Sequence, residues 1–332
     1  MLVLSFRDMS VPRRGGVTPA AIYDLSPVNA GMSWWPAPQL RPAPWRDVTP
    51  IVDGKHVCFL VHGFNVDRDN GYTGYGAFGQ ELEPGGMLPG LGPPPLVPID
   101  LEAAGVDVVI PVLWAGDWYL PVNYPFLLPD IRLTGRYFAD LILSSATNMA
   151  RVSFVTHSMG ARVVFEAVQR TMVGARAAGV KPPVFDMAIL TAPATSDEIL
   201  DDPNYADAVA AIEEFVVVSS RADRVLSLAF PLGNRVEQAM WPNDPGANAA
   251  LGRYGPRLKS GSKALGKTGW YEIPPATKQR HSDYVPEPSN PVAPYPNGWS
   301  PKRLAVGALA QAVLDRQPAP WPPAKTVTPR GA

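Results

Sequence analysis

Short apolar runs, rich in β-branched and aromatic residues, recur along the chain from about residue 51. Nearly every position within a run is apolar, whereas a strand with one solvated face would alternate apolar and polar residues. Continuous runs of this kind are typical of strands that are buried on both faces of a parallel sheet. We expect strands at residues 56–61, 106–114, 152–156, 186–192 and 214–219, and a further candidate at 269–273.

Segments with helical periodicity lie between these runs. They occupy residues 133–150, 158–173, 203–213 and 301–317. The last is well delimited, because Ser300 can cap it, Pro301 suits a first helical turn and Pro318 follows its end. Alternating strands and helices predict βαβ crossovers, and therefore an α/β fold with a mostly parallel central sheet and helices on both faces.

The regular pattern suggests one main domain over residues 51–317. Residues 1–50 are expected to be an N-terminal extension packed on this core, and they start with a strand-like run, MLVLSFRDMS. Proline accounts for 39 of the 332 residues, more than twice its usual share of about 5%. Long irregular loops should therefore decorate the core, above all a proline-rich insertion at 84–98, and the tail 318–332 should be flexible.

Charge and composition narrow the choice of partners. There are 29 basic and 30 acidic residues and no long run of either sign, so no nucleic-acid groove is expected. No apolar run reaches the roughly 18 residues of a membrane span, and the N-terminus is too short in apolar residues for a secretory signal. A soluble, cytoplasmic protein is the expectation. The single cysteine, Cys58, lies in an apolar run, and neither a metal site nor a cofactor is predicted.

The segment VSFVTHSMGARVVF, residues 152–165, changes from strand-like to helix-like at Ser158. Thr156-His-Ser-Met-Gly160 is a variant of the G-x-S-x-G nucleophile elbow, in which a strained turn between strand and helix exposes the serine. Thr156 replaces the usual first glycine and should crowd the turn, while Gly160 leaves room for it. The alternative is that Ser158 only caps a helix.

A serine nucleophile needs a base to accept its proton. The chain has four histidines. His56 begins a strand, His62 belongs to a His-Gly pair, and His157 adjoins the serine with its side chain expected to be turned elsewhere. His281, in the late segment KQRHSDYV, is therefore the candidate base.

The base in turn needs an acid to orient it. Asp223 follows the strand at 214–219, at the carboxyl edge of the sheet where catalytic groups collect. Asp197, after the preceding strand, is the rival acid, and Asp283 is a weaker candidate close to the histidine. Asp223 is also placed to cap the helix that RVLSLAF would begin, which is its structural alternative.

Acyl transfer also needs amide donors for a developing oxyanion. The N–H of Met159 follows the serine at a helix start and is one candidate donor. The other comes from FLVHGFNV, where a strand ends in His62-Gly63 and the glycine lets the N–H of Phe64 turn inward. A plain turn is the alternative for this pair.

The segment 115–131, AGDWYLPVNYPFLLPDI, is too apolar for an ordinary solvated loop. It is expected either to form a substrate-covering cap with an acyl-binding wall or to pack on residues 11–50. The candidate substrate-binding residues are Trp118, Tyr119, Phe126 and Leu127.

With these motifs the sequence resembles the α/β-hydrolase superfamily, and more closely a bacterial group of uncharacterised esterase-like serine hydrolases with VHGFN, HSMG and HSDY motifs. The resemblance implies a triad of Ser158, Asp223 and His281, with oxyanion amides from Phe64 and Met159. It implies a cofactor-free hydrolase that cleaves small carboxylic esters through an acyl-enzyme. An acyltransferase or lipase with the same triad is the alternative, as is a binding protein that has lost activity.

Overall fold

The computed structural model describes residues 2–10, 15–24, 41–43, 45–66, 106–117, 126–144, 148–240, 249–273, 275, 280–284, 325 and 327–329. The predicted proline-rich insertion at 84–98 and the predicted helix at 301–317 lie outside these residues, as do Trp118 and Tyr119.

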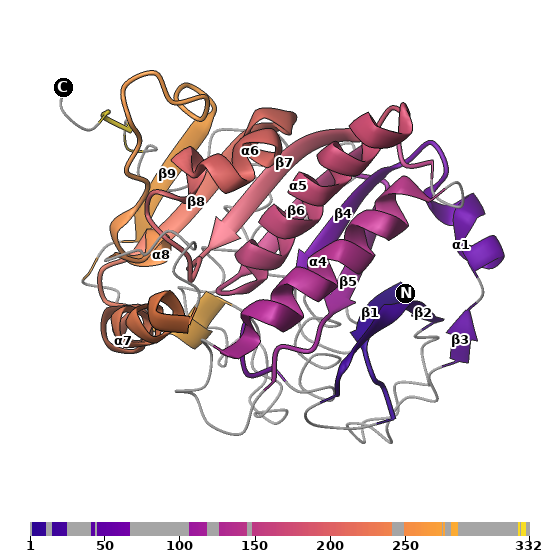
Figure 1. Cartoon of the computed structure of the whole chain (residues 1–332), viewed down its shortest axis with the longest axis horizontal. Helices are drawn as coiled ribbons and strands as arrows, with labels where there is room; N and C mark the ends of the chain where they lie inside the picture. Colours follow the sequence, from indigo (N-terminus) through magenta and orange to yellow (C-terminus); the bar gives the residue numbers. More distant parts are fainter. Residues whose placement is uncertain are drawn as a thin grey trace, which may run out of the picture.

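The described strands form one twisted sheet that runs through the molecule (Figure 1). Its order is β3-β2-β1-β5-β4-β6-β7-β8-β9. Along this order, each strand from β1 through β5, β4, β6, β7 and β8 to β9 is parallel to the next one. Strand β2 is antiparallel to both β1 and β3. The strands are β1 (Leu2–Arg7), β2 (Val17–Asp24), β3 (Arg41–Ala43), β4 (His56–Val61), β5 (Val108–Leu113), β6 (Arg151–His157), β7 (Val184–Thr191), β8 (Ile212–Ser220) and β9 (Thr268–Ile273).

Every strand predicted from an apolar run is present, which confirms the mostly parallel sheet. The central strand β4 is buried at all six of its positions, as expected for a strand covered on both faces. The N-terminal run also forms a strand, β1, and this strand pairs in parallel with β5. Strands β2 and β3 were not predicted, because they belong to a segment whose periodicity is weak.

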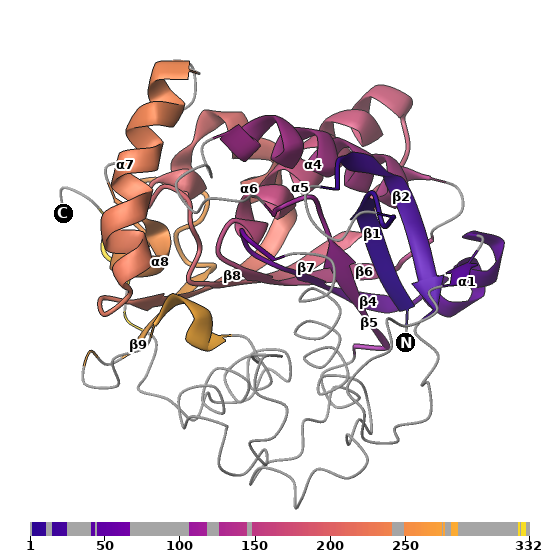
Figure 2. The ribbon, with the colours of Figure 1, turned by 90° about the horizontal axis from the view of Figure 1, so that it is seen from below.

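The helices described are α1 (Trp45–Val52), α4 (Leu128–Leu143), α5 (Gly160–Ala178), α6 (Ala206–Ala211), α7 (Arg224–Met240) and α8 (Leu251–Tyr254), with 3-10 turns η3 (Ile199–Asp201), η4 (Pro203–Tyr205) and η6 (His281–Tyr284). Helices α4, α5 and α6 lie together over one face of the sheet (Figure 2).

The described helices differ from their predicted bounds: α5 covers 160–178 rather than 158–173, and α6 covers 206–211 rather than 203–213. Helix α4 covers 128–143 rather than 133–150, because Pro129 is tolerated in a first turn and the backbone becomes extended at Ser144. Helix α7 extends for 17 residues and includes Pro231, whereas only its first residues were expected to be helical. Within the predicted flexible tail, Lys325 is described, and its N–H donates to the Trp270 carbonyl of the edge strand β9 at 2.7 Å.

The strand order locates the site. After β4 the chain forms β5 on one side of it, and then returns to form β6 on the other side. The carboxyl ends of β4 and β6 therefore flank the point where the strand order reverses, and open α/β sheets bind ligands in the crevice at such a point. His62-Gly63 follows the end of β4, and Ser158 follows the end of β6 directly.

Candidate active site

Ser158 lies on a strained turn between β6 and α5. Its φ is 54°, in the left-handed region that non-glycine residues rarely adopt. The turn is secured by backbone bonds, because the Ser158 N–H donates to Thr191 at 3.0 Å and its carbonyl accepts from Ala194 at 3.1 Å. A Cβ atom at Gly160 would lie 2.5 Å from the His62 carbonyl oxygen, so only glycine fits there. The elbow geometry expected from the sequence is present.

Thr156 does not crowd this turn. It is the last but one residue of β6, and its hydroxyl points to the neighbouring strand, with the Ile189 carbonyl at 3.4 Å. The larger side chain is therefore accommodated between two strands rather than in the elbow itself.

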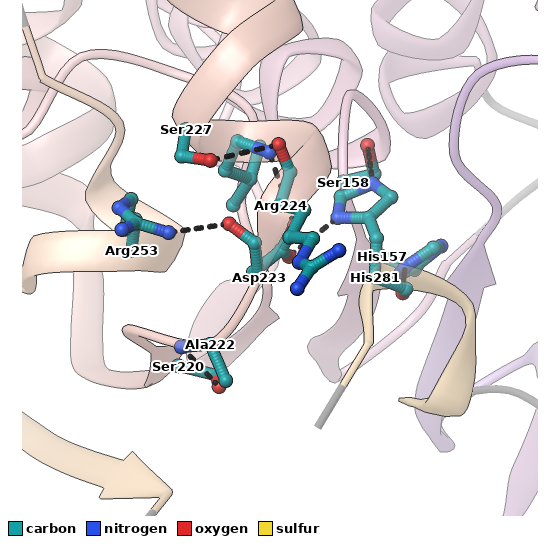
Figure 3. Close-up of polar contacts among 10 residues, drawn as sticks. His157, Ser158, Ser220, Ala222, Asp223, Arg224, Ser227, Arg253 and His281 are labelled. Carbon is teal, nitrogen blue, oxygen red and sulfur yellow. Dashed lines mark hydrogen bonds and ion pairs between the residues drawn. The ribbon is translucent and has the colours of Figure 1, made fainter. Parts of the chain in front are cut away.

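Three polar side chains meet at this turn (Figure 3). His281 Nε2 is 2.8 Å from Ser158 Oγ, and His281 Nδ1 is 2.7 Å from Asp223 Oδ2. A carboxylate only accepts hydrogen bonds, so His281 Nδ1 carries the proton in the neutral ring. Its Nε2 is then free to accept from the Ser158 hydroxyl. This is the arrangement that a general base requires.

Asp223 is fully buried and is held by three different contacts. Besides the bond to His281, its Oδ1 accepts from the Leu226 N–H at 3.0 Å, and its backbone carbonyl accepts from Arg253 Nη1 at 2.6 Å (Figure 3). The first of these is a helix cap on α7, whose positive end also favours a carboxylate. Asp223 therefore both caps α7 and contacts His281, so the two interpretations of this residue are compatible.

The turn after β4, which contains Gly63, also lies close to Ser158. A Cβ atom at Gly63 would lie 2.7 Å from the Ser158 Cβ, so the backbone before Phe64 passes close to the serine. Trp114 N–H donates to His62 Nε2 at 3.0 Å, and His62 Nδ1 donates to the Gly63 carbonyl at 2.7 Å. Burial lowers the pKa of His62 to about 3, which keeps this ring neutral. His62 thus braces the turn.

Met159 and Phe64 carry the amide groups that the sequence predicts as oxyanion donors. Met159 immediately precedes α5, where amide donors have no partner within the helix. Phe64 is partly buried against the core at the end of the turn after β4.

Asp197, the rival acid, lies elsewhere. It contacts Arg257 at 3.7 Å, and no hydrogen bond reaches its buried Oδ2. Burial raises the pKa of Asp197 to about 6, although the Arg257 charge opposes the shift. The position next to His281 belongs to Asp223 instead. Asp283 lies within η6, but its side chain is outside the described part.

The raised pKa of Asp197 predicts a pH-dependent stability. Its pKa is higher in the folded chain than the model-compound value of 3.8, so the folded state loses stability as pH rises from about 4 through about 6. Asp197→Asn should therefore gain stability over the parent across this range, by up to about 3 kcal/mol. Urea unfolding of both proteins at pH 4 and pH 7 measures this gain. A difference that does not change with pH would contradict it.

The candidate acyl-binding residues separate into two groups. Phe126 and Leu127 are described, and Phe126 is 45% exposed whereas Leu127 is fully buried in the main core. Leu127 therefore contributes to packing, and Phe126 is the accessible side chain of the pair. Trp118 and Tyr119 lie outside the described residues.

A second Ser/His/Asp grouping lies at the opposite edge of the sheet. His56 Nε2 is 2.8 Å from Ser153 Oγ and 3.9 Å from Asp186 Oδ2. Both contacts use the same ring nitrogen, so Asp186 does not orient the ring for Ser153. Ser153 has no exposed surface. This grouping serves packing, and it offers matched control residues.

Sequence reasoning missed two residues that contact His281 or Asp223. His157 was expected to point elsewhere, but its ring lies 4.9 Å from the His281 ring. Arg253 comes from the short helix α8, which the apolar pattern did not indicate. The position of His157 next to Ser158 was a sequence signal for that residue. The sequence offered no such signal for Arg253.

One family model matches part of the chain. The family described as "Alpha/beta hydrolase of unknown function (DUF900)" matches residues 136–249, which contain Ser158 and Asp223. The resemblance to the α/β-hydrolase superfamily is confirmed, and the chain has the α/β-hydrolase fold. No curated protein sequence matches the chain.

Solved structures with remote similarity include an esterase of Pyrobaculum calidifontis, with 11% identity, a TM-score of 0.34 and coverage of 95% of this chain and 84% of that one. An α/β-hydrolase enzyme from the metagenome of Lake Arreo, Spain, has 13% identity, a TM-score of 0.35 and coverage of 80% and 74%. Lipase B of Aspergillus fumigatus has 15% identity, a TM-score of 0.34 and coverage of 84% and 66%. At these scores the similarities carry no argument about activity. Within the described residues, no helix is long and apolar enough to cross a membrane.

Proposed function

We propose that the protein is a cofactor-independent serine hydrolase that cleaves carboxylic esters through an acyl-enzyme. The observation that carries this proposal is the chain of short contacts from Ser158 Oγ through His281 to Asp223, at 2.8 and 2.7 Å. Its location, at the reversal point of the strand order, is where an open α/β sheet presents a substrate site.

In the acylation step, Ser158 Oγ attacks the ester carbonyl while His281 Nε2 takes the hydroxyl proton. The Asp223 carboxylate stabilises the imidazolium that forms and keeps its Nδ1–H directed away from the serine. Negative charge develops on the carbonyl oxygen, where the N–H groups of Met159 and Phe64 would donate to it. His281 then returns the proton to the leaving alcohol, and an ester between the acyl group and Ser158 remains.

In the deacylation step, a water molecule replaces the alcohol. His281 takes a proton from this water as its oxygen attacks the acyl carbonyl, and the proton then passes to Ser158 Oγ as the acid departs. Serine at the elbow favours this acyl-enzyme route over one that begins with an aspartate nucleophile. An acyltransferase or a lipase would share the first step and differ in the acceptor or in the size of the substrate.

The test of this function is turnover of an activated short-chain ester together with labelling by a fluorophosphonate probe. We expect hydrolysis, and a single probe adduct mapped by mass spectrometry to Ser158. Absence of both turnover and adduct would identify a hydrolase-fold binding protein instead. Transfer to an added alcohol in preference to water would identify an acyltransferase.

Phe126 offers a test of substrate class. It precedes α4, which starts at the sheet edge where β5 ends, the same edge that carries Ser158. We expect Phe126→Ala to lower kcat/KM for medium-chain esters about tenfold, because an apolar contact with the acyl chain is lost. Acetate esters should be unaffected, and chain-length profiles of both proteins measure this. An unchanged profile would leave Phe126 without a role in the acyl site.

A further inference from the structure

His157 lies between the two segments that must converge on Ser158. On one side, a Cβ atom at Gly63 would lie 2.9 Å from His157 Nδ1, so the ring packs against the turn after β4. On the other side, its ring lies 4.9 Å from the His281 ring (Figure 3). It also lies 6.0 Å from the Tyr284 ring, and both of these residues belong to η6. One side chain thus spans the gap between the turn and η6.

A hydrogen bond defines the state of this ring. His157 Nε2 is 2.8 Å from the backbone carbonyl oxygen of His281. A carbonyl only accepts, so Nε2 carries the proton and donates it. Burial, reinforced by the nearby His281, lowers the pKa of His157 to about 3, although part of the residue remains exposed. The ring is therefore neutral at ordinary pH. Its Nε2–H points to the backbone of residues 280–284, the segment that carries His281.

The position of residues 280–284, the segment that carries His281, depends on contacts of this kind. Among the residues described around His281, the regular structure is the four-residue 3-10 turn η6, which does not pair with the sheet. Within the described residues, no ladder of strand hydrogen bonds holds this turn, and His281 contacts His157, Ser158 and Asp223. The bond from His157 is made to the backbone of the residue that carries the base, so it limits the rotation and displacement of that residue directly.

We propose that His157 is a positioning residue, which holds His281 at hydrogen-bond distance from Ser158 by donating its Nε2–H to the His281 carbonyl. The proposal rests on the hydrolase function proposed above, since it assigns His157 a part in placing the base of that reaction. His157 does not itself accept the serine proton, because its Nε2 already donates to a carbonyl and its basicity is low. Reaction rates fall steeply when a base is displaced, and about 10²-fold is expected for a displacement of about 1 Å.

Two substitutions test the donor. His157→Gln retains an amide N–H that can reach the same carbonyl, whereas His157→Leu fills much of the volume without a donor. We expect kcat for an activated ester to fall about 10²-fold in His157→Leu, with KM nearly unchanged, and to stay within about threefold of the parent in His157→Gln. Equal losses in both variants would overturn the assignment of the role to the donor, as would full activity of His157→Leu.

Two controls separate the loss of the positioning bond from a general effect of replacing a histidine. His56→Leu removes another histidine whose Nε2 makes a 2.8 Å hydrogen bond, here with Ser153 near the opposite ends of the strands, and it should leave kcat unchanged. Amide hydrogen exchange measures the backbone of residues 280–284 independently of activity, and it should accelerate at least tenfold in His157→Leu but not in His157→Gln. Unchanged exchange in His157→Leu would overturn the positioning role. If the parent itself turns over no ester, the hydrolase function fails, while the exchange result still decides whether His157 holds η6.

Discussion

Replacing Ser158 by alanine is expected to lower kcat for ester hydrolysis by about 10⁵- to 10⁶-fold. The substitution removes the atom that would attack the carbonyl, and neither His281 nor the oxyanion amides can form an acyl-enzyme without it. The variant should also take up no fluorophosphonate. Steady-state hydrolysis and intact-mass analysis of the probe-treated protein measure the two effects.

The fold should survive this change. The Ser158 side chain is buried and makes one side-chain hydrogen bond, to His281, so its loss should cost about 1 kcal/mol. The matched control is Ser153→Ala, because Ser153 lies on β6, is buried, and contacts a histidine Nε2 at the same 2.8 Å. That variant should retain both activity and labelling. Residual activity of Ser158→Ala near that of the parent would assign the reaction to another nucleophile.

Replacing Asp223 by asparagine should lower kcat by about 10⁴-fold while the protein stays folded. Asparagine caps helices about as well as aspartate, so the bond to the Leu226 N–H on α7 can persist. Its amide cannot favour the Nδ1–H tautomer as a carboxylate does, and His281 Nε2 would then lack the lone pair that accepts the serine proton. Asp223→Asn thus separates the catalytic role from the capping role.

Two further variants, Asp223→Ala and Asp197→Asn, serve as comparisons for Asp223→Asn. Asp223→Ala should lose activity as well, and should also lose about 1 kcal/mol or more of stability with the cap. Asp197→Asn, in the rival acid that contacts Arg257 rather than His281, should retain parental kcat. Hydrolysis rates and urea unfolding of the three variants measure these effects. Parental activity in Asp223→Asn would reduce Asp223 to a helix cap.

The family comparison covers the part of the chain from within α4 to beyond α7. Ser158 and Asp223 fall inside the matched residues, whereas His281 falls outside them. The role proposed for His281 therefore depends on its contacts alone, which makes the distances to Ser158 and Asp223 the essential observations.

The sequence alone indicated the buried parallel strands and the turn at Ser158. Continuous apolar runs marked the buried strands because burial on both faces leaves no position for polar residues. The change from strand to helix at Ser158, with Gly160 two positions later, marked the turn because this turn has local steric requirements. Elimination among four histidines led to His281 as the candidate base, and the strand before Asp223 made it a candidate acid beside the rival Asp197.

The tertiary structure alone decided which side chains meet. The contacts of His281 connect residues 58 and 123 positions apart in the chain, so no local pattern could choose Asp223 over Asp197 or direct the His157 ring toward the base. The same holds for Leu127, which looked like an apolar loop residue and is part of the core. Local sequence specifies backbone preferences through short-range sterics and burial, whereas the meeting of distant side chains depends on how the crossovers place strand ends along one edge of the sheet.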